Sequence, residues 1–153
     1  MDHQRLRRPS LVAAGLLALA VLVARHARAN SSPCPYSVST GVATDVATGL
    51  SWQVIASATA FAQVAGGGSC KVLGPTWRLP TLLELQTIVH EGKFSPAIDT
   101  TSFSGGVPSD VFFWSSTPSA DDATMAWGVY FDKGHTGTAD VAVAHSVRCV
   151  YGG

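Results

Sequence analysis

The segment from residue 77 to residue 89 carries the most closely specified local structure in the sequence, because it predicts an extended stretch that turns directly into a helix. Pro80 disfavours the α region at the residue before it, so the chain stays extended up to that point. Thr81 and Glu84 have the spacing of a capping box, in which each side chain satisfies a backbone N–H group at the other residue. Leucines follow at helical spacing and a glycine provides a stop, so we predict a helix over residues 81–91.

The first thirty residues do not resemble part of a folded domain. Arginines precede an apolar run from Leu11 to Ala24, and Ala27-Arg28-Ala29 offers small residues at both positions of a cleavage site. The apolar run is shorter than the ~20 residues that span a bilayer. We therefore expect a secretory signal peptide over residues 1–29, a tether over 30–35 and one domain over 36–153. Membrane attachment is expected only if the signal remains uncleaved, and the exported product would be secreted, periplasmic or held at the cell surface.

Loss of the signal peptide changes the charge balance. The remainder keeps five basic and nine acidic side chains, a net charge of −4 at neutral pH. An acidic domain without a basic cluster is a poor match for nucleic acid or for any polyanion held mainly by charge. About 120 residues remain, which is enough to bury one modest core.

Three cysteines, Cys34, Cys70 and Cys149, lie after the expected cleavage point. In an exported chain two of them are expected to pair and one is left over. We favour Cys70 with Cys149, because this bridge would close most of the domain into one loop, worth about 4 to 5 kcal/mol in the entropic model. Pairing of Cys34 with Cys149 is the alternative. The spacing of cysteines and histidines predicts no zinc site.

The rest of the chain predicts short elements separated by turns. A first hairpin is expected over residues 36–54, with its turn at Asp45–Gly49. A short helix is expected over residues 57–64, ending at the glycine triplet 66–68. Strands are expected where the pattern is continuously apolar or alternates, namely over 111–116, 126–132 and 141–151. The pattern indicates an α+β domain with two short helices packed on antiparallel hairpin strands.

Two loops are the candidate binding surface. Residues 94–110 are rich in Ser, Pro, Gly and Thr, with Ile98-Asp99 and Phe103 expected to attach them to the body of the domain, and residues 118–124 form a second exposed loop. Long ordered loops in compact domains often carry function. The candidate binding residues near the loop ends are Asp110, Asp121, Asp122 and Tyr130. The acidic loop raises the alternative of a calcium site, but its spacing matches no EF-hand, so we assign no metal ligand.

Other prominent side chains are interpreted as structural. The tryptophans lie in apolar strand motifs, which favours core packing over stacking on a sugar; they are Trp52, Trp77, Trp114 and Trp127. Arg78 stands between two apolar residues and is expected to be a buried cation paired with Glu84 or Asp99. His145 lies on an apolar face, and the Ser115-Ser116 pair lacks a nucleophile elbow, so no catalytic triad is predicted.

Six motifs in a fixed order carry a family resemblance. They are Asp45-x-x-Thr48-Gly49-Leu50-x-Trp52-Gln53, Trp77-Arg78-Leu79-Pro80-Thr81-x-x-Glu84-Leu85, Ile98-Asp99, Trp114-Ser115-Ser116, Ala126-Trp127-x-Val129-x-Phe131 and Val147-Arg148-Cys149-Val150. Together they resemble the bacterial extracellular domains similar to the C-terminal domain of the collagen-like adhesin Lcl. The resemblance implies a C-type-lectin-like fold, distantly related to the formylglycine-generating enzymes, and binding at the cell surface, in the adhesin to sulfated glycosaminoglycans. This chain has no collagen-like repeat, so trimerisation does not carry over.

We therefore expect an exported, non-enzymatic binding or adhesion module that recognises an extracellular carbohydrate or protein through the loops 94–110 and 118–124. The alternative is a structural component of the cell surface or matrix, cross-linked through Cys34. No sequence motif supports an enzyme related to the formylglycine-generating enzymes, and no cofactor is predicted.

Overall fold

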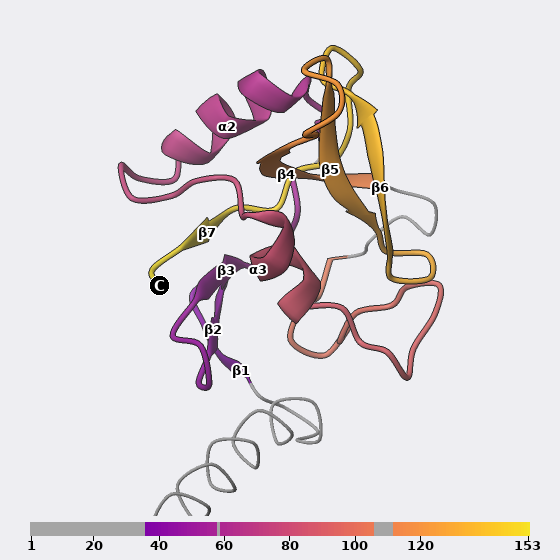
Figure 1. Cartoon of the computed structure of the whole chain (residues 1–153). Helices are drawn as coiled ribbons and strands as arrows, with labels where there is room; N and C mark the ends of the chain where they lie inside the picture. The colour runs from indigo at the N-terminus through magenta and orange to yellow at the C-terminus, as the bar shows by residue number, and fades with distance from the viewer. Residues whose placement is uncertain (1–35, 58, 106–111) are drawn as a thin grey trace, which may run out of the picture. The chain divides into compact units, whose positions relative to one another are not determined.

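The computed structural model describes residues 36–57, 59–105 and 112–153. The expected signal peptide, the tether with Cys34, and Asp110 lie outside these residues. The described part is an α+β fold with two antiparallel sheets and two short helices (Figure 1). In chain order the elements are β1 (Tyr36–Ser39), β2 (Val42–Asp45), β3 (Ser51–Gln53), α2 (Gln63–Lys71), α3 (Leu82–Thr87), β4 (Phe112–Pro118), β5 (Met125–Tyr130), β6 (His135–Asp140) and β7 (Val150–Tyr151).

The first sheet has the strand order β1-β2-β3-β7 and confirms the predicted hairpin at its centre. Asp45 organises the turn between β2 and β3, because its carboxylate accepts hydrogen bonds from Ala47 N at 2.8 Å and Thr48 Oγ1 at 2.7 Å. A second turn divides the segment before it. Thr40 and Gly41 both have positive φ, 47° and 79°, as a tight two-residue hairpin turn requires.

The second sheet has the order β4-β5-β6. The strands predicted over 111–116 and 126–132 correspond to β4 and β5, whereas β6 was not predicted because its sequence of threonines, glycine and alanine has no strong apolar alternation. Gly128 of β5 is opposite Trp114, and a Cβ there would collide with the carbonyl oxygen of Phe113 and the ring of Phe112. The close approach of β4 therefore explains a glycine inside a strand.

Helix α3 begins with the predicted capping box. Thr81 Oγ1 accepts from Glu84 N at 3.2 Å, and Thr81 N donates to Glu84 Oε2 at 2.7 Å. The predicted end at residue 91 is wrong, because the helix ends at Thr87. Val89 instead forms an isolated antiparallel bridge with Ile98, so a pairing with the following loop ends the helix early.

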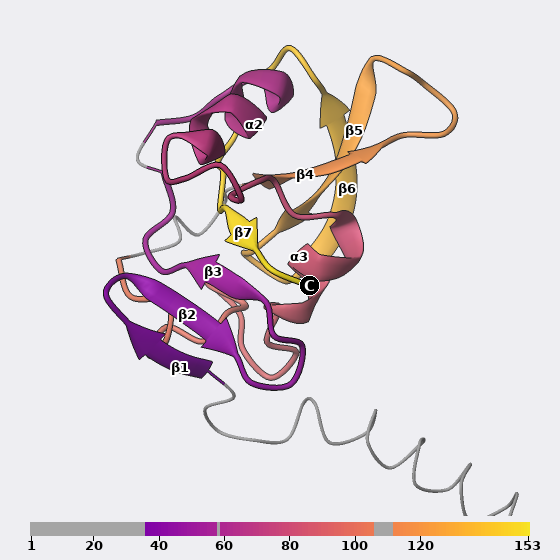
Figure 2. The ribbon, with the colours of Figure 1, turned by 90° about the vertical axis from the view of Figure 1, so that its left-hand side faces the viewer.

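The helix predicted over residues 57–64 is wrong. Helix α2 spans Gln63–Lys71 and contains the glycine triplet that we expected to end it. Gly66 is buried, and a Cβ on it would lie 2.8 Å from Val147 Cγ2. The helix can lie this close to the last segment of the chain only because the position has no side chain. Helix α2 packs against β4 and α3 against both β4 and β5 (Figure 2).

Two glycines of α2 should respond oppositely to alanine. Gly66→Ala should lower the free energy of unfolding by about 1 to 3 kcal/mol, because the new methyl group meets buried Val147. Gly68→Ala meets nothing within 4 Å and should raise that free energy by about 0.5 to 1 kcal/mol through helix propensity. Urea denaturation of the two variants measures both values, and equal shifts would contradict the packing of α2 described here.

The last segment departs most from its prediction. Only Val150–Tyr151 of the strand expected over 141–151 is a strand. The preceding residues change partners along the chain: His145 pairs with Phe61, Ser146 with Phe113 of β4, and Val150 with Arg78 and β3. This segment thus joins both sheets and the N-terminal side of α2.

The core has two parts, one on each side of β4. Phe113 packs with Trp52, Leu85 and their neighbours, whereas Phe112 and Trp114 pack with Cys70, Leu79 and Val147. Alternate side chains of β4 enter different clusters, which explains why its first three residues, Phe112–Trp114, are all apolar. Trp52 and Trp114 are fully buried as predicted, and Trp77 and Trp127 are half-buried.

Candidate functional site

The described part of the first predicted loop, residues 94–105, is attached to the fold where we expected it. Ile98, Asp99 and Phe103 are buried. The Asp99 carboxylate accepts hydrogen bonds from Ser102 Oγ at 2.7 Å and from Thr101 N at 3.1 Å. Burial raises the pKa of Asp99, but these bonds, with Lys93 Nζ at 3.3 Å, outweigh it and hold the pKa below its usual value. These hydrogen bonds therefore hold the loop at residues 101 and 102.

Phe94 is the most exposed aromatic side chain near this loop, at 81% exposure. Its neighbour Ser95 donates its N–H to Asp132 O at 2.6 Å, and Ala97 N donates to Phe131 O at 2.7 Å. These bonds attach the loop to the turn between β5 and β6. The Phe94 ring is thus exposed to solvent next to a backbone segment that is held by hydrogen bonds.

The second predicted loop, at residues 118–124, lies at the other end of β5. Asp121 and Asp122 are exposed there. Hydrogen bonds from Thr124 Oγ1 at 2.7 Å and Thr124 N at 2.8 Å lower the pKa of Asp122. A six-residue strand is about 17 Å long, so these carboxylates are well separated from the 94–105 loop (Figure 1).

Tyr130 lies at the end of β5 that is nearer the 94–105 loop. Its ring stacks on His135 with centroids 4.6 Å apart and meets Phe112 edge-on at 4.9 Å. The structure therefore does not bring Tyr130 together with Asp121 and Asp122. In the described ranges no three His, Cys, Asp or Glu side chains gather closely enough to hold a metal ion.

Arg78 makes the ion pair that the sequence predicts. Its two terminal nitrogens contact both carboxylate oxygens of Glu84, at 2.8 and 2.7 Å. They also donate to the carbonyls of Leu79 at 3.3 Å and Gly152 at 3.2 Å, so all four terminal N–H groups are used. The hydrogen bonds from Arg78 are the main reason that the pKa of Glu84 is lowered to about 2. The pair is less buried than expected, because the Arg78 side chain is 38% exposed.

The Arg78–Glu84 pair should make stability depend on acid pH. The pKa of Glu84 is about 2 in the folded chain and near 4.5 without its partners, so its contribution is present above that higher value and is lost as pH falls through the lower one. Because Arg78 is partly exposed, we expect only about 1 kcal/mol. Glu84→Gln keeps the capping box but should lack this part of the pH dependence. Chemical denaturation from about pH 5 to about pH 2 measures the difference, and parallel curves would contradict the prediction.

A groove lies between α2, the segment carrying Arg78, and β4. Its volume is about 440 Å³, and its lining residues are Gln63, Val64, Gly67, Lys71, Arg78, Leu79 and Ser116. The groove was not predicted from the sequence, because the predicted helix ended before Lys71 and did not include this wall. The sequence feature that could have indicated the groove is the glycine triplet 66–68, because small residues allow a helix to pack closely against its neighbours.

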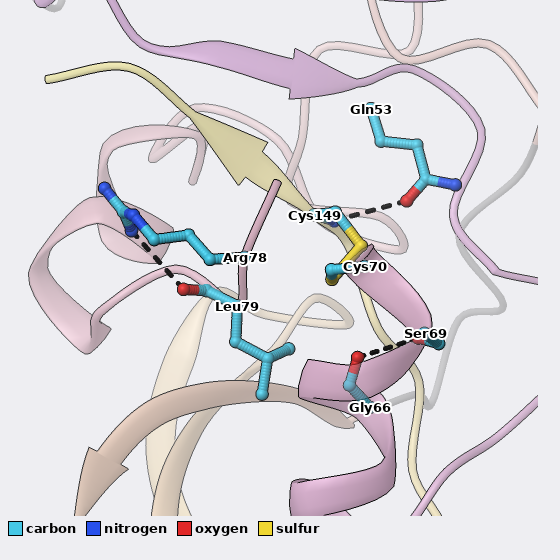
Figure 3. The surroundings of a disulfide bond; sticks show 7 residues. All are labelled: Gln53, Gly66, Ser69, Cys70, Arg78, Leu79 and Cys149. Carbon is cyan, nitrogen blue, oxygen red and sulfur yellow. Dashed lines mark hydrogen bonds between the residues drawn. A yellow bond between two sulfur atoms is a disulfide. The ribbon is translucent and has the colours of Figure 1, made fainter. Parts of the chain in front are cut away.

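The predicted disulfide between Cys70 and Cys149 is present, with an S–S distance of 2.04 Å (Figure 3). Both residues are buried. The bridge joins the last turn of α2 to the residue before β7, where Cys149 N also donates to Gln53 Oε1 at 3.2 Å. It therefore fixes the helix that forms one wall of the groove.

Arg148 is a buried cation that was not predicted from the sequence. Only 1% of it is exposed, and its Nη1 donates to the carbonyls of Gln53 at 2.7 Å and Val54 at 2.5 Å. The guanidinium also lies over Phe103 and Phe113, 4.9 and 5.7 Å from the ring centroids. Burial lowers the pKa of Arg148 to about 10. The partners of Arg148 are backbone carbonyls and aromatic rings, which carry no opposite charge. The sequence therefore gives no charge pattern from which the burial of Arg148 could be predicted.

The serine and histidine considered for catalysis have structural contacts. Ser115 Oγ donates to Trp127 O at 2.6 Å. His145 packs against Phe112 and Trp114, with centroids 4.8 and 5.1 Å apart, and burial lowers its pKa.

The family comparison agrees with the order of the motifs. The model of the Lcl C-terminal domain matches residues 41–151, which include every described strand except β1, both helices and the disulfide. No similar curated protein was found. The matched domain is associated with adhesins rather than with an enzyme family. Among the helices of the described ranges, none has the length and apolar character needed to cross a membrane. With the match covering most of its length, the chain belongs to the Lcl C-terminal domain family.

Proposed function

We propose that this protein is an exported, non-enzymatic binding module that recognises a carbohydrate or protein ligand outside the cytoplasm. The observation that carries the proposal is membership of an adhesin-associated domain family. The basic, apolar and small-residue pattern over residues 1–29 supports export. The family resemblance is also our ground for proposing that the two sheets and two helices form a C-type-lectin-like fold.

The ligand surface we propose is the end of the domain that carries the 94–105 loop. Its backbone is already held by Asp132, Phe131 and the Asp99 hydrogen bonds, so binding requires little further ordering. Exposed Phe94 offers an aromatic face to a sugar ring or an anchor to a partner pocket. The 118–124 loop is a second surface, which the same ligand reaches only if it is long enough to extend along β5.

Replacing Phe94 by alanine tests this surface. On arrays of glycans and extracellular-matrix proteins, Phe94→Ala should weaken binding of the best ligand about tenfold or more, which corresponds to about 1.4 kcal/mol. Leu83→Ala is the matched control, because Leu83 is also an exposed apolar residue, at 76% exposure, but lies on α3.

Two other outcomes would change the proposal. If Asp121→Asn with Asp122→Asn abolishes binding while Phe94→Ala does not, the site is the 118–124 loop, and repeating the measurement with a chelator decides whether calcium takes part. Binding to no glycan and no protein on the arrays would contradict a recognition function.

A further inference from the structure

The groove beside α2 has the character of a second binding site, apart from the 94–105 loop. Val64, Gly67 and Lys71 stand one turn apart along α2, and Leu79 lies opposite them. Val64 is 80% exposed at the rim, and Gly67 is half-buried, with Leu79 Cδ1 3.9 Å from the position that a Cβ would take. The groove joins β4 at Ser116, towards the end of that strand where Pro118 pairs with β5. The 94–105 loop is attached beyond the opposite end of β5.

The charge in the groove comes from Lys71. Arg78 also lines it, but its terminal N–H groups are all engaged and its charge is balanced by Glu84. Lys71 Nζ donates to Pro75 O at 2.8 Å and has donors to spare. Within the described ranges no carboxylate lies at ion-pair distance from it. An aliphatic groove therefore has an uncompensated cation at one end.

The lining chemistry favours a protein segment over a sugar. None of the described residues that line the groove is aromatic, so it offers no face on which a sugar ring would stack. Gln63 donates through Nε2 to Ser115 O at 3.0 Å, which leaves its Oε1 as an acceptor for a backbone N–H. Exposed Val64, with the small part of Leu79 that reaches the surface, suits an aliphatic side chain, and Lys71 suits a carboxylate next to it.

We propose that this groove binds an extended segment of a partner protein in which aliphatic side chains alternate with acidic ones. Apolar contact, mainly with exposed Val64, provides affinity, and the ion pair with Lys71 selects acidic segments over neutral ones. The site acts independently of the ligand surface at Phe94, so one domain can hold two partners at once.

The test is an NMR titration of the full exported chain with the peptide Gly-Ser-Leu-Glu-Val-Glu-Leu-Ser-Gly, blocked at both ends. The amide signals of Gly67, Lys71 and Leu79 should shift. The peptide with both glutamates replaced by glutamine should bind about tenfold more weakly. Lys71→Glu should reduce affinity by at least that factor, and Lys71→Gln, which introduces no negative charge into the groove, should also reduce it. Lys133→Glu is the matched control, because it makes the same charge change in the β5–β6 turn and should bind as wild type.

Equal binding of the acidic and neutral peptides, or shifts outside the groove, would overturn the proposal. So would a sulfated heparin oligosaccharide that shifts the groove signals when the acidic peptide does not. Phe94→Ala should leave peptide binding unchanged, which separates failure of this site from failure of the proposed function at the 94–105 loop.

Discussion

Replacing Cys70 and Cys149 together by serine is expected to lower the free energy of unfolding by about 4 kcal/mol. The two cysteines are 79 residues apart in sequence, so the bridge removes the closure entropy of a loop that holds most of the domain. That amount is a large share of the total stability of a domain of this size. The bridge also holds α2, a helix that contains three glycines and has no side-chain cap at its start. Without the bridge we expect α2 to be the first element to loosen.

Guanidinium denaturation of the double variant measures this loss, with the Cys34→Ser variant as the control for replacing a thiol. The control should unfold as the wild type does, because the Cys70–Cys149 bridge remains. Amide hydrogen exchange should show that protection is lost in α2 before it is lost in β5. A double variant within about 1 kcal/mol of wild type would show that packing of α2 on Val147 and Leu79 is sufficient without the crosslink.

Local features of this fold were predictable because their causes are local. The capping box of Thr81 and Glu84 depends on residues three positions apart, and both predicted reciprocal hydrogen bonds are present. The turn at Asp45 and the strands β4 and β5 likewise follow from short patterns. The disulfide was predictable for a different reason, since three cysteines allow only three pairings.

Features that depend on distant packing were predicted wrongly. The local sequence pattern of the α2 glycines predicts the end of a helix. Gly66 is instead required because Val147, far along the chain, lies too close for a side chain at position 66. Alternation predicted one long strand near the C-terminus, whereas that segment pairs in turn with Phe61, β4 and β3. The sequence of the segment itself contains no pattern that indicates where its pairing partner changes.

The candidate site shows the same limit. The sequence identified both loops, and Asp99 and Phe103 attach the first one as predicted. It could not show that β5 holds the loops at opposite ends, because loop position follows from strand direction and pairing. The groove was missed altogether, since its walls come from α2, the Arg78 segment and β4.

Replacing Arg148 should be the most damaging change to a single charged residue. We expect Arg148→Ala to lower the free energy of unfolding by about 4 kcal/mol, because it leaves a cavity and removes two charge-assisted hydrogen bonds. Arg78→Ala is the matched control and should lower it by about 1 kcal/mol, since that side chain is 38% exposed. Comparing the two variants tests whether buried Arg148 or the partly exposed Arg78–Glu84 ion pair contributes more to the stability of the domain.

Arg148→Met separates packing from hydrogen bonding at this position. Methionine fills much of the space between Phe103 and Phe113 but gives the carbonyls of Gln53 and Val54 no donor, so a loss of about 2 kcal/mol is expected. Burying a guanidinium is itself unfavourable, and its Nε has no hydrogen-bond partner among the described residues. If Arg148→Met is as stable as wild type in urea denaturation, the hydrogen bonds only offset that desolvation. A loss near 2 kcal/mol would show that Arg148 stabilises the junction of β3, the 94–105 loop and the last segment through its two carbonyl contacts.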